Sequence, residues 1–254
     1  MSNEPGQPAP NPQPSITTNL AAPKVAMAIG AHPDDIEFGC GATLAKWAAA
    51  GTEIHHVVCT DGSKGTWDVN ADTEALVITR QSEQIAAAQV LSTEPRVHFL
   101  DHVDGELENT SELQRQIARL IRTHKPDVVL SHDPWKQYRL HPDHRIAGQA
   151  VCDAIVAARD PHFLRDLGIA HHRPSTLLMW EAQVVHHAED VTDWVETKLR
   201  ALEAHESQFE STMKVPNGSG SLDKFRSRIT KRLEDLGALH GFGAAEVFSR
   251  ISDL

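Results

Sequence analysis

Residues 24–35 read KVAMAIGAHPDD, and this stretch decides how the rest of the chain is interpreted. Its apolar part ends at Gly30, which predicts a short buried strand closed by a turn. One histidine and two aspartates, His32, Asp34 and Asp35, follow at the carboxyl end of that strand. Adjacent carboxylates repel each other unless a cation offsets their charge. The turn therefore predicts a binding site as well as a connection to a helix.

Strand-like and helix-like segments alternate after this stretch. The predicted strands are residues 53–60, 96–100, 127–131 and 175–180, and the predicted helices are residues 36–50, 73–91, 111–124, 191–207 and 222–236. Such alternation implies right-handed crossovers and a mostly parallel sheet covered on both faces. The sequence thus predicts one Rossmann-like three-layer α/β/α domain over residues 23–254. Residues 1–22, rich in Pro, Asn and Gln, are expected to form a flexible tail.

Composition excludes several classes of function. The chain has 254 residues and a net charge of -11, with 35 acidic against 24 basic residues, which disfavours a nucleic-acid surface. No apolar run approaches the roughly 20 residues of a membrane span, and the N-terminus lacks the apolar core of a secretory signal. The cysteines, Cys40, Cys59 and Cys152, are odd in number and widely spaced. They predict reduced thiols in a cytoplasmic protein.

A second group of chemically active residues follows the strand predicted at residues 127–131, and it includes His141-Pro-Asp-His144. In open α/β sheets, ligands bind beyond the carboxyl ends of the strands, where both groups are expected to lie. Zinc accepts histidine nitrogen and aspartate oxygen in a tetrahedral shell that leaves one position for water. Helix capping is the alternative, and it explains Asp35 or Asp143 but not the neighbouring histidines. Adjacent pairs such as His55-His56 are poor co-ligands because strand neighbours point to opposite faces.

These motifs resemble the LmbE-like, or PIG-L, family of zinc-dependent N-deacetylases. The resemblance rests on AHPDD at residues 31–35 and HPDH at residues 141–144. It extends from about residue 24 to about residue 209 through four further segments: CTDGSKG (59–65), RQSE (80–83), FLDHVDG (99–105) and HESQ (205–208). Two specific motifs in order, with this supporting set, make chance similarity a poor explanation.

The resemblance implies a role for each motif residue. Three residues are expected to bind Zn²⁺: His32, Asp35 and His144. Three are expected to act in catalysis: Asp34 as the general base that takes a proton from water, His141 as the group that stabilises the oxyanion or protonates the leaving amine, and Asp143 as the carboxylate that orients a histidine. The division of labour between Asp34 and Asp35 rests on the resemblance, because spacing alone does not separate adjacent aspartates.

Two further residues are candidates for binding substrate, and each has an alternative. Arg80 resembles the substrate-contacting arginine of the family, but it could equally form a surface pair with Glu83 or Glu74 on its own helix. Asp104 could bind sugar hydroxyls or only shape the turn before Gly105.

The implied function is zinc-dependent removal of the N-acetyl group from an N-acetylglucosamine-type small molecule, in a family whose members often form homo-oligomers. One alternative is an amidase that cleaves a larger thiol-conjugate or antibiotic amide. An alternative from another class is a nucleotide-binding module without hydrolysis, since Gly39 and Gly41 follow the first strand. In a dinucleotide site, however, the glycines form the turn itself. Here the turn holds His-Pro-Asp-Asp, so the glycines indicate close helix–sheet packing.

Overall fold

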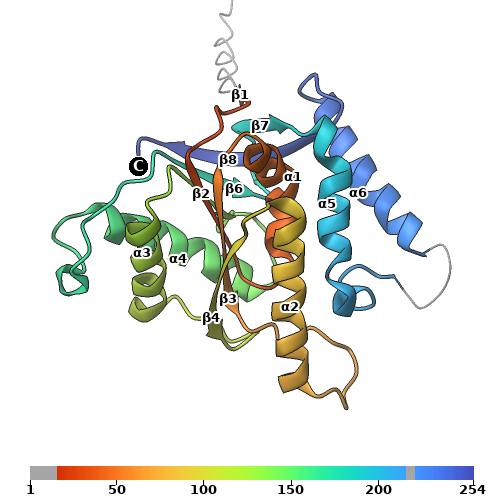
Figure 1. Cartoon of the computed structure of the whole chain (residues 1–254), viewed down its shortest axis with the longest axis horizontal. Helices are drawn as coiled ribbons and strands as arrows, with labels where there is room; N and C mark the ends of the chain where they lie inside the picture. Colours follow the sequence, from red (N-terminus) through yellow and green to blue (C-terminus); the bar gives the residue numbers. More distant parts are fainter. Residues whose placement is uncertain (1–15, 216–220) are drawn as a thin grey trace, which may run out of the picture.

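The computed structural model describes residues 16–215 and 221–254 (Figure 1). Within them, eight strands form one sheet in the order β1-β7-β8-β6-β5-β2-β3-β4. The strands are β1 (Thr17–Thr18), β2 (Val25–Gly30), β3 (Glu53–Thr60), β4 (Arg96–His102), β5 (Val128–His132), β6 (Thr176–Trp180), β7 (His187–Asp190) and β8 (Ala245–Ser252). The six helices described are α1 (Asp35–Ala49), α2 (Thr73–Leu91), α3 (Ser111–His124), α4 (Pro142–Arg159), α5 (Val195–Glu203) and α6 (Ser221–Ala238).

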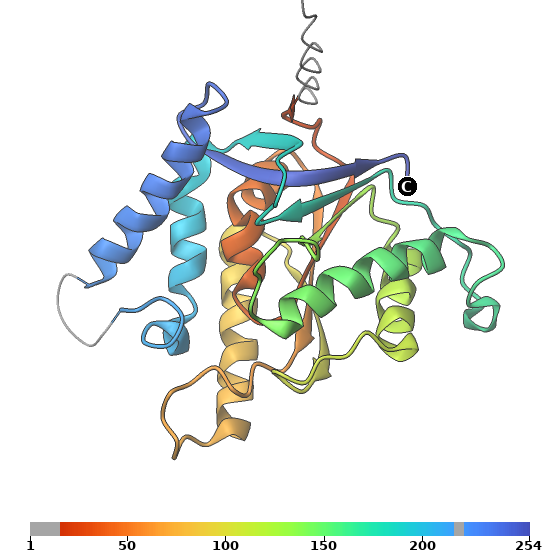
Figure 2. The same cartoon turned by 180° about the vertical axis from the view of Figure 1, so that it is seen from behind.

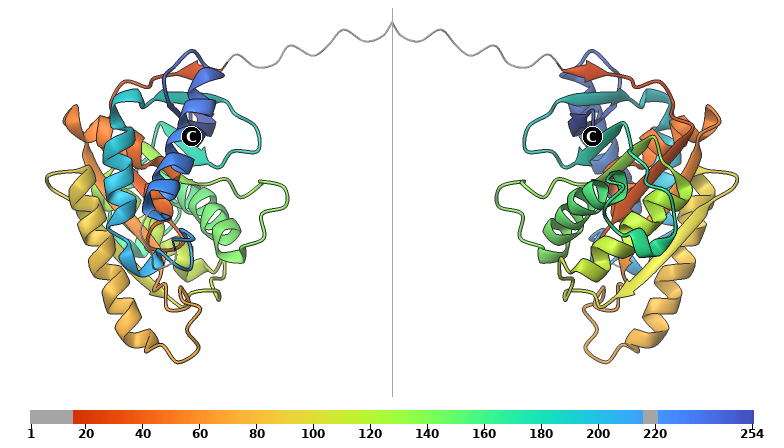
Figure 3. Two further views of the ribbon diagram at one scale, coloured as in Figure 1. Left: turned by 90° about the vertical axis from the view of Figure 1, so that its right-hand side faces the viewer. Right: turned by 90° about the vertical axis from the view of Figure 1, so that its left-hand side faces the viewer.

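Helices cover both faces of this sheet, as Figures 1 and 2 show from opposite sides. On one face, Met27 and Ile29 of β2 pack in a core with α3 and α4. On the other face, Ala26 and Ala28 pack in a core with α1 and α2, and α5 and α6 lie side by side outside α1 (Figure 3). Because a parallel strand is buried on both faces, its sequence is a continuous apolar run. The predicted three-layer α/β/α fold is confirmed.

The strand order reverses beside β2. The chain runs from β2 to β3 to β4 on one side, and β5 then pairs with β2 on the other side, with Ile29 opposite Ser131. The connections after β2 and β5 therefore leave the sheet toward opposite faces and open a crevice between them. His32 follows β2, and His132 ends β5, so both lie at this switch point.

The C-terminal part contains two strands that the sequence analysis missed. β8 runs antiparallel to both β6 and β7, which makes the sheet mixed. Its sequence gave a weak signal because Glu246 is a buried carboxylate paired with Lys198 at 2.6 Å. The helix expected over residues 191–207 is also shorter than predicted: α5 spans Val195–Glu203 and has a 3₁₀ turn on either side.

Part of the segment predicted as an N-terminal tail pairs with the sheet. Residues 1–15 of that tail lie outside the described residues. Thr17–Thr18, however, forms β1 and pairs in parallel with β7. The backbone N–H of Leu20 donates to Glu189 Oε1 at 2.8 Å. These contacts join segments about 170 positions apart, and composition alone gives no sign of them.

Candidate active site

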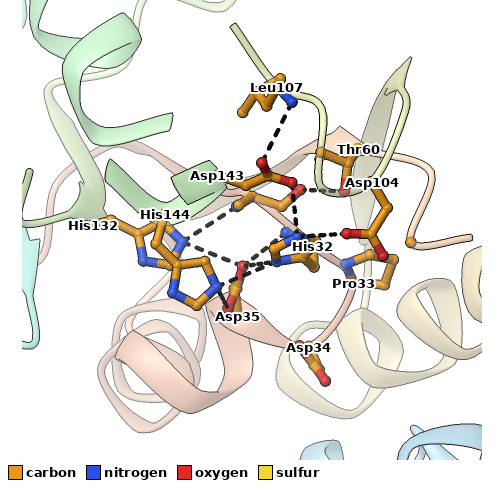
Figure 4. A network of polar contacts seen from close by, with 12 residues as sticks. His32, Pro33, Asp34, Asp35, Thr60, Asp104, Leu107, His132, Asp143 and His144 are labelled. Atoms are coloured by element: carbon orange, nitrogen blue, oxygen red, sulfur yellow. Dashed lines mark hydrogen bonds and ion pairs between the residues drawn. The ribbon is translucent and has the colours of Figure 1, made fainter. Parts of the chain in front are cut away.

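Three side chains from two loops meet at the switch point (Figure 4). His32 and Asp35 come from the turn after β2, and His144 comes from the first turn of α4. His32 Nδ1 lies 3.2 Å from both His144 Nε2 and Asp35 Oδ2, and His144 Nε2 lies 3.2 Å from Asp35 Oδ1. In a tetrahedral zinc site with bonds of about 2.0 Å, ligand atoms stand about 3.3 Å apart. The three side chains therefore have the donor atoms and the spacing that Zn²⁺ requires.

The backbone at Asp34 separates the two adjacent aspartates. Asp34 has φ 102°, a conformation that is uncommon for any residue with a side chain and is best tolerated by Asp and Asn. This turn sends Asp35 toward His32, whose backbone N–H donates to Asp35 Oδ2 at 2.7 Å. The Asp34 side chain points away from that group (Figure 4). Strained backbone of this kind concentrates at functional sites, and here it gives each carboxylate a different environment.

The second ring nitrogen of His32 is held by two carboxylates. His32 Nε2 lies 3.0 Å from Asp104 Oδ1 and 3.2 Å from Asp143 Oδ2. Asp143 is itself fixed, because it is fully buried and accepts the backbone N–H of Gly105 at 2.6 Å. A proton on Nε2 leaves the lone pair of Nδ1 free for a metal ion. His32 is thus the histidine that Asp143 orients, and Asp104 shares this task.

The charges of the site favour an additional cation. Burial lowers the pKa of His32, but hydrogen bonds to Asp104 and Asp143 more than offset this and raise it well above its usual value. Burial also lowers the pKa of His144, to about 3, so this ring is neutral and can donate a lone pair. Burial would raise the pKa of Asp35, but its histidine neighbours, His144 first, hold it well below its usual range. A divalent ion can replace the proton that His32 otherwise carries.

Asp34 is placed to accept a proton. Its side chain is buried, and among the described residues its Oδ2 has no hydrogen-bond partner, with Arg80 Nη2 3.7 Å away. Its backbone N–H donates to Gln84 Oε1 at 3.1 Å. Burial raises the pKa of Asp34 to about 6, and the charge of Arg80 offsets part of this effect. The carboxylate is therefore ionised at neutral pH and has a pKa close to that expected of a general base.

Arg80 is buried beside Asp34 and lines the cavity. Its Nη1 donates to the Gly62 carbonyl at 2.9 Å, and its Nη2 donates to the Pro33 carbonyl at 2.6 Å. Glu83, one possible partner on the same helix, instead accepts the backbone N–H of Ser207 at 2.7 Å. The Arg80 side chain therefore lies in the candidate active site and does not form an ion pair on the surface of α2.

His141 stands at the rim of the same site. Its ring centroid lies 4.6 Å from that of His32 and 4.7 Å from that of His144. Burial lowers its pKa, which favours the neutral ring. The adjoining cavity has a volume of about 550 Å³, and the predicted site residues that line it are His32, Asp34, Asp35, Arg80, Asp104, His141 and His144. The structure thus brings seven of the eight predicted residues to one cavity, with Asp143 buried behind His32.

His132 is a site residue that sequence reasoning left unassigned. Its Nδ1 accepts hydrogen bonds from Trp180 Nε1 and Arg139 Nη1, both at 3.0 Å. Its Nε2 accepts the backbone N–H of Ala31 at 3.2 Å and lies 3.2 Å from Asp35 Oδ2. His132 therefore joins the turn after β2 to the end of β5 and contacts Asp35. The signal that could have identified it was its position at the end of β5, beside the switch point.

A buried polar network behind Asp34 was also missed. Gln84, which holds the Asp34 backbone, donates to Glu37 Oε1 at 2.8 Å. Glu37 Oε2 lies 3.3 Å from His205 Nε2, and both residues have no exposed surface. Gln208 lines the cavity and donates to the carbonyl of Gly65 at 3.1 Å. The HESQ segment therefore supports the site from the far C-terminal part of the chain.

Of the two glycines after the first strand, Gly39 is required for packing, as predicted, whereas a Cβ on Gly41 would approach Lys198 no closer than 3.6 Å. A Cβ on Gly39 would approach the ring of Trp180 in β6 to 2.5 Å, so only glycine allows α1 to lie this close to the sheet. The turn that a dinucleotide fingerprint would occupy holds His32, Asp34 and Asp35. The site therefore defines a class: an α/β protein with a histidine–carboxylate centre suited to a divalent ion at its switch point.

Comparison with known proteins narrows this class. Residues 27–155 match the PIG-L family model, described as GlcNAc-PI de-N-acetylase. Diacetylchitobiose deacetylase of Thermococcus kodakarensis is 36% identical over 189 residues, which span 73% of this chain and 70% of that protein. A 1D-myo-inositol 2-acetamido-2-deoxy-alpha-D-glucopyranoside deacetylase of Saccharopolyspora erythraea is 32% identical over 168 residues, or 56% of this chain and 60% of that protein. The chain belongs to the PIG-L family.

Structural comparison agrees. The N,N'-diacetylchitobiose deacetylase from Pyrococcus horikoshii superposes with a TM-score of 0.81 at 27% identity, over 91% of this chain and 84% of that one. These relatives are deacetylases, enzymes that hydrolyse amide C–N bonds outside peptides. The family and enzyme class expected from the sequence motifs are thereby confirmed, and dependence on a metal ion fits the family.

Proposed function

We propose that this protein is a zinc-dependent N-deacetylase that removes the acetyl group from an N-acetylglucosamine-type small molecule. The observation that carries the proposal is the group His32, Asp35 and His144, whose ligand atoms stand 3.2 Å apart beside Asp34, a carboxylate whose Oδ2 accepts no hydrogen bond from the described residues. This combination has both components of metal-assisted hydrolysis: a set of metal ligands and a base within the same cavity.

His32, Asp35 and His144 would hold the ion. When bound, Zn²⁺ supplies the Lewis acid that polarises the amide carbonyl and lowers the pKa of the attacking water. Asp34 takes a proton from that water, a role that its raised pKa of about 6 suits. His141, at the rim, stabilises the developing oxyanion or gives a proton to the leaving amine. Asp143 acts through His32 and is a positioning residue.

Arg80 and Asp104 are the proposed contacts for the sugar. Both are buried and both line the cavity. The Asp104 carboxylate already accepts the backbone N–H of Lys64 at 3.0 Å and contacts His32, but each of its oxygens has a further lone pair for a sugar hydroxyl. Arg80 carries donors that suit hydroxyl or carbonyl oxygens. Asp104 therefore links substrate recognition to the orientation of a metal ligand.

The substrate class follows from the relatives, whose names specify a disaccharide of N-acetylglucosamine in one case and an N-acetylglucosaminyl inositol in the other. A larger thiol-conjugate or antibiotic amide is the alternative that the same centre could cleave. No helix in the described part of the chain is long and apolar enough to cross a membrane. The free thiols of Cys40, Cys59 and Cys152 fit a reducing compartment such as the cytoplasm.

Amine release from a panel of N-acetylglucosamine derivatives, including diacetylchitobiose and an N-acetylglucosaminyl inositol, tests the proposal. Zinc-loaded protein should release amine, and chelator-stripped protein should not. His144→Ala should lose all detectable activity and one equivalent of zinc, whereas His162→Ala, at an exposed histidine, should lose neither. If zinc-loaded protein releases no amine from any compound of the panel, a larger amide would be indicated as the substrate. Unchanged zinc content in His144→Ala would remove this residue from the ligand set.

A further inference from the structure

A second group of histidines lies at the opposite end of the strands. His55 is near the start of β3, His98 is on β4, and His124 ends α3 just before β5 begins. The active site lies beyond the carboxyl ends of β2 and β5, whereas these three residues gather at the amino ends of the parallel strands. The family motifs contain none of them. We call His55, His98 and His124 the amino-end histidines.

The rings of the amino-end histidines converge from three elements. His55 Nδ1 lies 3.0 Å from His98 Nε2. The ring centroid of His124 lies 4.1 Å from that of His55 and 5.0 Å from that of His98. One ring nitrogen from each residue lies within 4.8 Å of the other two. His56, the sequence neighbour of His55, points to the opposite face toward Glu37, as strand geometry requires.

A carboxylate orients the central ring. Glu53 Oε1 lies 2.8 Å from His55 Nε2, and Arg96 Nε holds the same oxygen at 3.1 Å. Because the carboxylate accepts, the proton of His55 is on Nε2 and the Nδ1 lone pair faces the other two rings. A carboxylate or carbonyl behind the distal nitrogen is the usual support of a metal-binding histidine. Burial lowers the pKa of His55 to about 4 and also lowers those of His98 and His124, so all three rings are neutral at pH 7.

We propose that the amino-end histidines form a second metal site, separate from the active site, for a divalent transition ion of the class that prefers imidazole, such as Zn²⁺. Three nitrogen ligands with one open position match the donor sets of zinc, cobalt and nickel sites. His98 and His124 are half-buried, so the ion can enter from solvent and keep a water molecule. In the metal-free protein, His98 Nε2–H can donate a hydrogen bond to His55 Nδ1. A metal ion would replace this hydrogen bond, because His98 would then carry its proton on Nδ1 and offer the Nε2 lone pair to the ion.

The site would stabilise the edge of the sheet. β4 is the edge strand, and α3 packs over β3 on this face. An ion that joins all three elements ties the edge strand to its neighbour and to the covering helix. Because it binds only the folded chain, it raises the apparent stability in proportion to the logarithm of its concentration. Catalysis, at the other end of the strands, should not depend on it.

The test uses metal content and thermal stability as readouts. Chelator-stripped protein is titrated with Zn²⁺ and with Co²⁺, in the wild type, in His98→Gln and in His162→Gln, which changes an exposed histidine outside the group. The wild type and His162→Gln should bind two equivalents, and His98→Gln should bind one. A single equivalent in the wild type, located in the active site by its loss in His144→Ala, would overturn the proposal. So would two equivalents in His98→Gln.

Zinc binding by the His144→Ala variant distinguishes the second-site proposal from the proposed function. His144→Ala lacks an active-site ligand, so the zinc that it retains reports on the amino-end histidines. It should still bind one equivalent, and zinc should raise its Tm. Adding His98→Gln or His124→Gln to it should abolish both effects. A His144→Ala protein that binds no zinc would refute the second site whatever the activity. In the wild-type background, His98→Gln should keep kcat/KM within about twofold, since His98 lies at the opposite end of the strands from the active site.

Discussion

Buried carboxylates occur in two regions of this molecule, and the two regions neutralise them differently. Away from the active site, each buried glutamate has its own lysine and a backbone donor. Glu246 meets Lys198 Nζ at 2.6 Å and the N–H of Thr43 at 2.8 Å. Glu189 meets Lys46 Nζ at 2.8 Å and the N–H of Leu20 at 2.8 Å. Every carboxylate oxygen of these two residues accepts a hydrogen bond.

The active site reverses this arrangement. Four buried aspartates, Asp34, Asp35, Asp104 and Asp143, gather near His32, and within the described residues Arg80 is the arginine or lysine that pairs with any of them. Backbone N–H groups and His32 offset part of their burial cost, and the part that remains marks groups kept for function, because stability alone would favour a paired or apolar residue. A divalent cation would restore the balance. The contrast predicts that changes in the two regions affect different quantities, catalysis in one and stability in the other.

Asp34→Asn should have the largest effect of the three changes considered. The amide keeps the shape but cannot take a proton, so kcat should fall by about 10²–10⁴-fold while zinc content stays the same. Because the substitution removes a buried charge with an unpaired oxygen, the free energy of unfolding should not decrease. Steady-state kinetics, metal analysis and urea denaturation of the same preparation measure all three quantities. A variant with the wild-type kcat would show that Asp34 is not the general base. A marked loss of stability would contradict the proposed difference between the two regions.

Lys198→Met should show the opposite pattern. The change leaves Glu246 buried without its cation, between α1, α5 and β8, and breaking a buried pair on one side costs about 3–5 kcal/mol. The free energy of unfolding should fall by that amount, while kcat per folded molecule should stay near the wild-type value. Lys231→Met, at an exposed surface pair on α6, provides the control and should leave the stability nearly unchanged. A fall in kcat with stability intact would place Lys198 in the active site.

The sequence allowed prediction of local features of the site but not of its long-range contacts. The strand-end rule located the turns that carry His32 and His144, because a strand and the residues after it are neighbours in the chain. The separate surroundings of Asp34 and Asp35 depend on the φ of 102° at Asp34, which no spacing reveals. The contact between His32 and Asp143 joins positions 111 residues apart. It becomes visible only when α4 is packed against the sheet.

The same distinction applies to the fold. The apolar runs of β2 to β6 were recognisable because parallel strands are buried on both faces. β8 was not, because its Glu246 reads as a surface residue until Lys198 is placed beside it. β1 escaped notice because backbone hydrogen bonds to β7 and Glu189 hold it, and these do not depend on an apolar pattern. Buried charge that is paired within the fold is therefore the feature that sequence patterns hide most effectively.

Of the three changes, Glu189→Gln should have the smallest effect, and its effect on the free energy of unfolding should depend on pH. Burial would raise the pKa of Glu189, but hydrogen bonds from His187 and Lys46, together with the charge of Lys46, lower it. A carboxyl whose folded-state pKa is lowered stabilises the protein above its unfolded pKa of about 4.3, and this stabilisation is lost as the pH falls through the folded value. At pH 7 the variant should lose about 1.5–3 kcal/mol, the range for hydrogen bonds to a charged group. Between pH 6 and pH 3 its free energy of unfolding should fall less steeply than that of the wild type.

Urea denaturation across this pH range measures both the loss at pH 7 and the slope, with Glu74→Gln at an exposed position as the reference. Parallel pH profiles for Glu189→Gln and the wild type would show that Glu189 is not compensated as its contacts indicate, and the division between the two regions would then rest on Glu246 alone.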